Sequence, residues 1–155
     1  MSINMGLSNE QRQTMADAVT AVLADTYALY FKTHAYHWNV TGPRFHDLHN
    51  LFEAQYNELW TATDDIAERI RALGPKAPNS YAEMGKAASI ESDAKATAAD
   101  DMIADLVKGH EAVVATIRKA LELAGQHGDE ATGDLLAPRI NAHEKTAWML
   151  RSTLG

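Results

Sequence analysis

Four polar side chains share one face of a predicted helix that covers residues 45–73. They are His49, Glu53, Asp64 and Glu68, at offsets of 0, 4, 15 and 19 residues. At about 100° per residue, these offsets correspond to ~0°, ~40°, ~60° and ~100° around the helix axis. Imidazole nitrogens and carboxylate oxygens are ligands for transition metals. The spacing therefore predicts a metal-binding stripe.

The stripe is too long to surround one metal centre within a single chain. Fifteen residues separate His49 from Asp64, which is ~22 Å of axial rise. Metal–ligand bonds to nitrogen or oxygen are only ~2.0–2.2 Å long, so both halves of the stripe meet only if two copies of the helix lie antiparallel across a two-fold axis. We therefore expect a dimer with two equivalent sites. The alternative is a solvated acidic face that pairs with Arg69 and Arg71.

A second imidazole is expected near the histidine of this stripe. His37 lies on the apolar face of the preceding helix, close to the turn that leads to His49. The two rings can therefore approach each other and act as a pair of nitrogen ligands. The alternative for His37 is a core histidine whose hydrogen bonds are satisfied.

Apolar residues at spacings of three and four predict the helices that position these side chains. The first helix begins after Ser8, which stands in a capping-box arrangement, and ends near Gly42 and Pro43. The second helix covers 45–73 and ends at Gly74. Glycine supports a helix exit, and proline disfavours helical geometry in the residue before it.

The second half of the chain contains a long connection and two further helices. Residues 76–97 read as a crossover with one short helix at 81–84. The third helix includes 103–121 and closes near Gly125, and the fourth includes 136–150. A crossover of this length can join parallel helices. We therefore expect an all-α four-helix bundle with a short extra helix between its second and third helices.

Length and composition favour one globular domain, residues 1–155. Nearly half of the residues are apolar, and the chain has no cysteine, so a metal must be held by nitrogen and oxygen ligands. The start of the chain has no signal-peptide pattern and no apolar run reaches membrane-spanning length, so we expect a cytoplasmic location, with nucleoid association left open. The net charge of −7 argues against general attraction to phosphate backbones.

Three segments carry a resemblance to a known family. They are His37-Trp38-Asn39-Val40-x-Gly42-Pro43-x-Phe45, Leu48-His49-x-x-Phe52-Glu53 and Asp64-x-Ile66-Ala67-Glu68-Arg69. Together they resemble the signature of the DNA-binding proteins from starved cells, the Dps miniferritins. The resemblance extends over nearly the whole chain, from about residue 8 to residue 154.

The resemblance implies an inter-subunit ferroxidase centre that binds iron. His37 and His49 would be the nitrogen ligands from one subunit, and Asp64 and Glu68 the carboxylates from its two-fold partner. Glu53 takes the place of the fifth ligand, where many relatives have aspartate, which leaves the second iron position open. Hydrogen peroxide is the oxidant that the family favours, with dioxygen as the other option.

The resemblance also implies a hollow homo-dodecamer that stores ferric mineral and protects DNA from oxidative damage. Asp129, Glu130 and Asp134 match the acidic lining of its iron-entry pores, although acidic residues also suit a helix N-terminus on electrostatic grounds. Trp38 would lie beside the iron site, where an aromatic ring can intercept oxidising radicals. Its alternative role is core packing.

Four other histidines have weaker claims to a role at a metal. His46 lies on the stripe of the predicted site and could assist there, and His34 ranks with it as a neighbour of the site or a surface residue. His110 and His143 lie on the inward faces of the third and fourth helices, where they could meet as a rival metal site. We prefer core histidines for this pair, because the bundle lacks the Glu-x-x-His pairs of ferritin-like intra-bundle centres.

The competing function is a DNA-compacting protein with little ferroxidase activity. In the family, DNA binding often depends on a tail rich in lysine or arginine. The short extension at 1–7 has no basic residue, and only Arg151 stands near the other end. The sequence therefore favours ferrous oxidation over compaction, and a plain helical scaffold is the third option.

Overall fold

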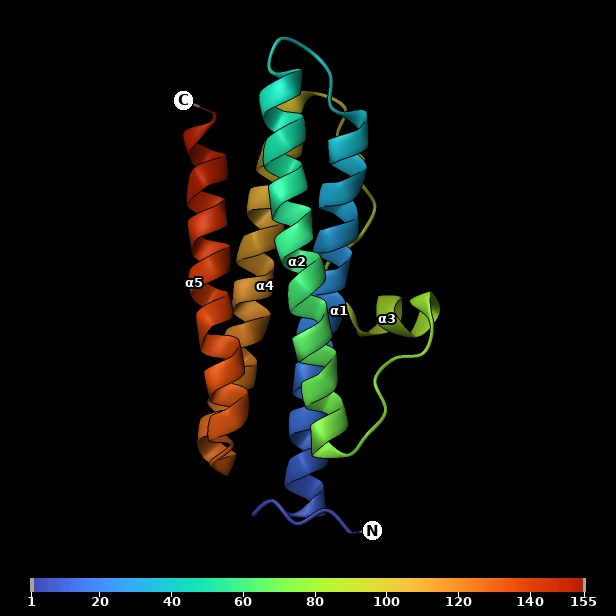
Figure 1. The fold of residues 1–155 in the computed structure, drawn as a ribbon, viewed down its shortest axis with the longest axis vertical. Coiled ribbons are helices and arrows are strands. Elements are labelled where there is room, and N and C mark those ends of the chain that lie inside the picture. The colour runs from blue at the N-terminus through green and yellow to red at the C-terminus, as the bar shows by residue number, and fades with distance from the viewer. Residues whose placement is uncertain (1, 155) are drawn as a thin grey trace.

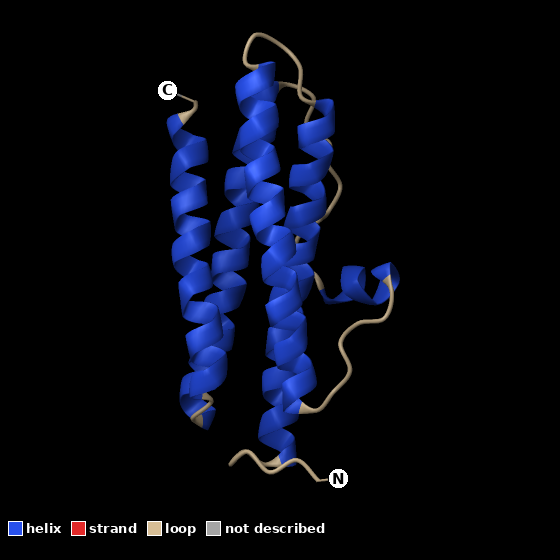
Figure 2. Cartoon of the chain, viewed as in Figure 1, coloured by secondary structure: helices blue, strands red, loops and turns tan. Residues whose placement is uncertain are grey.

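The computed structural model describes residues 2–154, so residues 1 and 155 of the predicted domain lie outside the described part. Within that part every regular element is a helix (Figure 2). The elements are α1 (Asn9–Asn39), α2 (Phe45–Leu73), α3 (Tyr81–Ala87), α4 (Ala99–His127) and α5 (Glu130–Ser152). The four long helices form a bundle, and α3 stands beside α1 (Figure 1). The predicted all-α bundle with a short crossover helix is confirmed.

α1 begins and ends where local chemistry requires it. The Ser8 hydroxyl accepts a hydrogen bond from the Gln11 amide at 3.1 Å, and the Gln11 side chain accepts one from the Ser8 amide at 2.8 Å, which completes a capping box. After α1, Gly42 adopts a φ of 106°, a backbone region that favours glycine. Its carbonyl accepts the Phe45 amide at 3.0 Å, and this turn starts α2 antiparallel to α1.

α2 is one uninterrupted helix from Phe45 to Leu73. It ends at Gly74, whose φ is 117° and whose amide donates to the Arg71 carbonyl at 3.1 Å. Arg12, at the start of α1, donates to the Leu73 carbonyl at 2.8 Å and ties the two helix ends together. The continuity of α2 matters because it fixes the axial distance between its two groups of metal-ligand candidates.

The crossover is fastened to the bundle by a buried carboxylate. Asp25 of α1 is fully buried and accepts hydrogen bonds from the Ser89 amide at 2.6 Å and the Ser89 hydroxyl at 2.7 Å. It also accepts the Thr116 hydroxyl of α4 at 2.6 Å. A buried charge is tolerated when hydrogen bonds satisfy it, so Asp25 joins α1, the crossover and α4.

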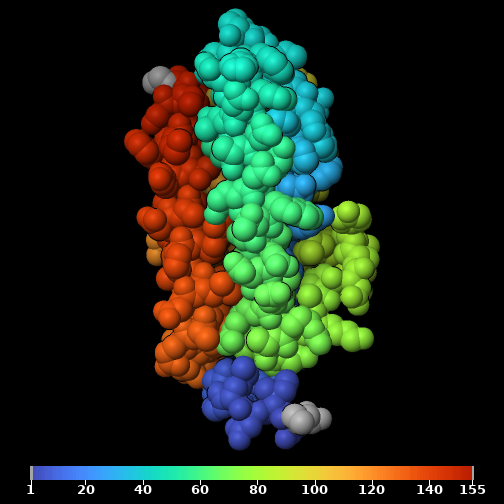
Figure 3. Space-filling view, in the orientation of Figure 1, coloured from blue at the N-terminus to red at the C-terminus, as the bar shows by residue number. Residues whose placement is uncertain are grey.

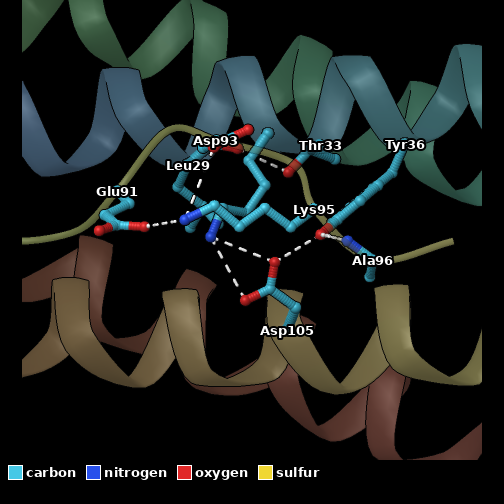
Figure 4. Close-up of polar contacts among 9 residues, drawn as sticks. Leu29, Thr33, Tyr36, Glu91, Asp93, Lys95, Ala96 and Asp105 are labelled. Carbon is cyan, nitrogen blue, oxygen red and sulfur yellow. Dashed lines mark hydrogen bonds and ion pairs between the residues drawn. The ribbon is translucent and has the colours of Figure 1, made fainter.

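A second polar group holds the end of the crossover (Figure 4). The Tyr36 hydroxyl donates to Asp105 at 2.6 Å and accepts the Ala96 amide at 3.3 Å. Lys32 pairs with the same carboxylate at 3.2 Å. Burial, followed by the hydrogen bond to Asp105, raises the pKa of the Tyr36 phenol far above its usual range, so it remains a donor at neutral pH.

The third long helix ends close to the predicted Gly125. α4 continues through Gly125 to His127, and Gly128 caps it with a φ of 67°. The Gly128 amide donates to the Ala124 carbonyl. A glycine in a helix interior is only mildly unfavourable, whereas the left-handed cap needs the glycine that lies further along.

Apolar side chains from α1, α2, α4 and α5 fill the centre of the bundle. Among the large side chains that are fully buried are Met15, Leu29, Phe52, Leu59, Ile66, Ile103, Leu106 and Ile117. In the space-filling view α2 runs along the near face, between α5 and the segment around α3, so much of its outer surface faces solvent (Figure 3). None of the described helices is long and apolar enough to cross a membrane.

Candidate metal centre

Two histidines from consecutive helices stack at one end of the bundle. His37 comes from the last turn of α1 and His49 from the first turns of α2, so the short turn between these helices brings them together. Their ring centroids are 3.7 Å apart with an interplanar angle of 19°. The predicted approach of the two imidazoles is confirmed.

A reciprocal pair of hydrogen bonds fixes the orientation of both rings. The Nδ1 of His37 lies 2.8 Å from the carbonyl oxygen of His49, and the Nδ1 of His49 lies 2.8 Å from the carbonyl oxygen of His37. A carbonyl oxygen only accepts, so each Nδ1 carries a proton and donates it. In the neutral rings both Nε2 atoms then hold a free lone pair, the form in which histidine binds metals.

The candidate carboxylates on α2 have no competing partner. Asp64 and Glu68 are exposed, and neither takes part in an ion pair within residues 2–154. The pairing with Arg69 and Arg71, which was one part of the predicted alternative, is wrong, whereas the exposure of both carboxylates agrees with a solvated face. Arg69 pairs with Asp129 at 2.7 Å, and Arg71 donates to the carbonyl of Pro75 at 2.6 Å. Both carboxylates therefore remain available to a cation.

The two groups of ligand candidates do not meet within one subunit. α2 is continuous between His49 and Asp64, so these residues are separated by ~22 Å along the helix axis, as predicted. No group of three histidine or acidic side chains with metal-binding geometry occurs among residues 2–154. The histidine pair thus offers two ligands, and further protein ligands would have to come from outside its own subunit or from Glu53.

The other predicted neighbours of the site occupy different environments. Glu53 is exposed one turn after His49, with no ion-pair partner in the described chain. His46 is also exposed, and its Nε2 lies 3.2 Å from the side-chain amide of Asn50. Trp38 is 57% exposed, so its alternative role in the core of the subunit is wrong. It lies against His34, with ring centroids 4.1 Å apart.

Aromatic rings that sequence reasoning missed surround the histidine pair. Tyr56 meets His37 edge-on at 5.1 Å and stacks on His34 at 3.9 Å. Tyr30 lies one step further, with its hydroxyl 3.1 Å from the Nδ1 of His34. Tyr56 follows His49 by seven residues and Tyr30 precedes His37 by seven, which is about two helical turns in each case. That spacing was the signal that could have found them.

Burial shapes the protonation of this aromatic group. Desolvation raises the pKa of Tyr27 to about 12, and it also raises the pKa of Tyr30. Both phenols are therefore protonated at neutral pH. Desolvation, assisted by the nearby His37, lowers the pKa of His34, so that imidazole is neutral under the same conditions.

Comparison with known proteins identifies the family. Residues 16–155 match the family described as the ferritin-like domain. The protein from Bacillus anthracis named DNA protection during starvation protein 2 is 39% identical over 133 residues, which cover 86% of this chain and 91% of that protein. This chain belongs to the Dps family of ferritin-like proteins.

Two further similar proteins match nearly the whole chain. An uncharacterised low-temperature-induced protein from Nostoc is 40% identical over 152 residues, covering 97% of this chain and 85% of that protein. The crystal structure of a Dps protein from Vibrio cholerae superposes with a TM-score of 0.92 and 34% identity, covering 99% and 100% of the two chains. That structure is described as a member of the ferritin-like diiron-carboxylate superfamily.

The acidic residues at the start of α5 have different surroundings in this Dps-family chain. Asp129 is buried and caps α5 by accepting the Thr132 amide at 3.0 Å, while it pairs with Arg69. Its carboxylate is therefore engaged within its own subunit. Glu130 and Asp134 are exposed and have no ion pair within the described residues.

The remaining predicted pair, His110 and His143, meets in the interior of the Dps fold. Their Nδ1 atoms are 2.9 Å apart, and both side chains are buried. One ring must donate and the other accept, so the accepting ring is neutral in this contact. Desolvation, followed by the nearby Arg139 cation, lowers the pKa of His110 to about 3, and desolvation also lowers the pKa of His143. These properties agree with the preferred interpretation as core histidines.

We expect this buried pair to make the fold sensitive to acid. Unfolded histidine titrates near ~6.5 and the folded groups titrate lower, so the unfolded chain binds more protons between about pH 6.5 and pH 3. The free energy of unfolding should then fall with decreasing pH, by up to ~1.4 kcal/mol per unit for each histidine. Denaturant unfolding of a His110→Gln/His143→Gln variant should show a flatter slope over this range. A His46→Gln control should keep the steep slope; equal slopes in all three proteins would refute the expectation.

Proposed function

We propose that this Dps-family protein oxidises ferrous iron at sites shared between two copies of the chain. His37 and His49 of one copy and Asp64 and Glu68 of the second copy would bind the substrate iron. Glu53 would supply the fifth ligand position. Membership of the ferritin-like family, in contrast to the proposed ferrous oxidation, rests on the comparisons with known proteins.

One observation carries the proposal. The histidine pair has both Nε2 lone pairs free and both rings held in place, yet the carboxylates that match it are unpaired and ~22 Å away along α2. An antiparallel second copy of α2 removes that mismatch, because it places each histidine pair opposite the carboxylates of the other helix. Two equivalent sites then form for each two-fold pair.

Exposed aromatic side chains on the same helices support an association of copies. Exposed aromatic side chains, here called the aromatic face, lie on α1, α2 and α3: Phe31, Trp38, Phe45, Trp60 and Tyr81. A groove of about 920 Å³ between α1 and the crossover is lined by three of them, Phe31, Trp38 and Tyr81. Clustered exposed apolar surface marks an interaction site. A second copy seated here would cover the aromatic face and deliver its carboxylates.

The chemistry follows from the ligand types. Each ferrous ion loses one electron, and two such ions reduce one hydrogen peroxide to two hydroxide ions. Imidazole and carboxylate ligands favour the loss, because anionic oxygen stabilises the ferric product. Ferric iron would then pass into the cavity of a dodecamer, with Glu130 and Asp134 lining the entry pores. Asp129 would support those pores from within the subunit, by capping α5.

Anaerobic titration with ferrous iron, followed by a pulse of peroxide, tests this function. Metal-dependent oxidation that is faster than in buffer, at two sites per two-fold pair, supports the ferroxidase. If iron is not oxidised and plasmid DNA is bound in a salt-sensitive way, the compaction function replaces it. If neither occurs, the protein is a helical scaffold.

For DNA we expect no stable complex with duplex at physiological salt without divalent cations. The net charge is −7, and the described residues before Ser8 have no basic side chain, so few phosphate contacts are available to release counterions. An electrophoretic mobility assay with plasmid DNA measures this directly. A shift at about 150 mM salt that weakens steeply as salt rises would show the expectation to be wrong.

A further inference from the structure

Two histidine pairs in this chain consist of the same side chains but differ in their lone pairs. In the pair of His37 and His49, both Nδ1 atoms donate to carbonyl oxygens, so both Nε2 lone pairs are free. His110 of α4 and His143 of α5 form the second pair, here called the buried pair, with Nδ1 atoms 2.9 Å apart. Neutral imidazoles bind divalent metals readily. The buried pair therefore competes for metal unless its lone pairs are occupied.

A cleft between α4 and α5 makes the buried pair accessible to ions. Its volume is about 420 Å³, and both His110 and His143 line it. Glu111 and Glu144 line the same cleft and are exposed, so it is open to solvent. Carboxylates in a cleft raise the local concentration of cations. Burial of the two imidazoles alone does not keep metal away from them.

Arg139 contacts the buried pair and is held in place by an ion pair. It lies one helical turn before His143 on α5, and its Nη2 is 3.5 Å from the Nε2 of His143. Both terminal nitrogens of the guanidinium donate to the carboxylate of Glu58 on α2, Nη2 at 3.0 Å. The side chain of Arg139 is only 13% exposed. The guanidinium is therefore fixed beside His143.

The contact with Arg139 determines where both ring protons of the pair lie. A guanidinium stays protonated and has no acceptor, so the Nε2 of His143 accepts and carries no proton. The proton of that ring is then on Nδ1, which donates to the Nδ1 of His110. The proton of His110 is consequently on its Nε2, a buried atom with no hydrogen-bond partner among residues 2–154. No nitrogen of the buried pair keeps a free lone pair.

The charge of Arg139 acts in the same direction. Desolvation is the main cause of the lowered pKa of His110 and His143, and the Arg139 cation lowers both pKa values further. A divalent ion at the buried pair would meet the same two penalties as a proton, loss of water and repulsion by the guanidinium.

We propose that Arg139 is a specificity-determining residue that keeps divalent metal off the buried pair. Freeing a lone pair on either ring for a metal moves the proton of His143 from Nδ1 to Nε2, where it opposes an N–H of Arg139. Ferrous iron is then left to the pair of His37 and His49, a consequence that rests on the proposed function. The exclusion itself does not rest on it, because it depends only on the contacts of the buried pair.

Anomalous diffraction from crystals soaked in cobalt(II) tests the exclusion. Cobalt(II) stands next to ferrous iron in ligand affinity and is not oxidised by air. We expect no cobalt at the buried pair of the wild-type protein and one cobalt per subunit there in Arg139→Met. The ion should be lost again in Arg139→Met/His110→Gln. Cobalt bound to His110 or His143 in the wild-type protein, or none there in Arg139→Met, overturns the proposal.

Arg118 provides a matched control on the same cleft. It is exposed and pairs with Glu144 at 3.1 Å, and it has no hydrogen bond to either histidine of the buried pair within the described chain. Arg118→Met removes the same charge and should leave the pair without cobalt. Equal cobalt occupancy in Arg118→Met and Arg139→Met would show that loss of any nearby cation admits the ion, which overturns the role of the Arg139 contact.

A second measurement needs neither iron nor a variant of Arg139. Solid-state nuclear magnetic resonance of the assembled, metal-free protein with nitrogen-15 histidine distinguishes protonated from unprotonated ring nitrogens. We expect the proton of His143 on Nδ1 and that of His110 on Nε2 at neutral pH, with signals assigned by their loss in His143→Gln and His110→Gln. The opposite tautomer of either ring overturns the proposal. Failure of the ferroxidase would appear only in the ferrous titration and would leave these results unchanged.

Discussion

We expect an Asp64→Ala/Glu68→Ala variant to lose rapid ferrous oxidation while its oligomer still forms. The two carboxylates are exposed and have no ion pair in the described chain. Their removal should therefore change the free energy of unfolding of the subunit only slightly. The proposed site loses both of its anionic ligands from the second copy, and two imidazoles alone hold ferrous iron weakly. Initial rates after mixing with iron and peroxide should fall to the rate in buffer.

The neighbouring Asp65 provides a matched control for this experiment. It is exposed on the same helix as Asp64 but points about 100° away from it around the axis. Asp65→Ala removes the same charge and should keep the native rate. Size-exclusion chromatography with light scattering checks that each variant assembles. An unchanged initial rate in the double variant would eliminate the proposed ligands.

Much of the fold could be predicted, because the signals were local. The helix starts and ends at Ser8, Gly42 and Gly74 depend on hydrogen bonds and backbone angles within a few residues. Gly125 marked the approximate end of α4, and the helix continues to His127 because a glycine is tolerated inside a helix. Only the structure shows that Gly128 is the residue with the left-handed φ.

The sequence predicted which residues form the candidate site. It did not predict the orientation of the two imidazole rings or which nitrogen of each ring carries the proton. Helical periodicity placed His49 and the carboxylates on one stripe, and the turn after α1 placed His37 nearby. The reciprocal hydrogen bonds, which leave both Nε2 atoms free, depend on ring orientations that no spacing specifies. The pairing of Arg69 with Asp129 was missed for a similar reason, since these residues lie sixty positions apart.

The exposure of Trp38 was also unpredictable from local sequence, because it depends on how the whole bundle packs. On α1 alone, an indole next to a core histidine suits either the interior or a covered surface. Packing of the whole bundle leaves Trp38 outside, on the aromatic face. The environment of Trp38 then depends on whether a partner covers the aromatic face. The residues next to Trp38 in the sequence do not reveal this.

The shared site is tested most directly by mixing two inactive variants. One chain carries His37→Ala/His49→Ala, and the other carries Asp64→Ala/Glu68→Ala. In every mixed two-fold pair, one site then has all of these native ligands and the other has none. The reason is the separation of ~22 Å along α2, which prevents either chain from closing a site alone.

Unfolding the two variants together and refolding them should therefore restore part of the ferrous oxidation rate. Mixing the folded variants without subunit exchange should restore none, which controls for simple addition of residual activities. Mass spectrometry verifies that the refolded oligomers contain both chains. Mixed oligomers that oxidise ferrous iron support a site built by two copies; mixed oligomers that remain as inactive as their parents would contradict it.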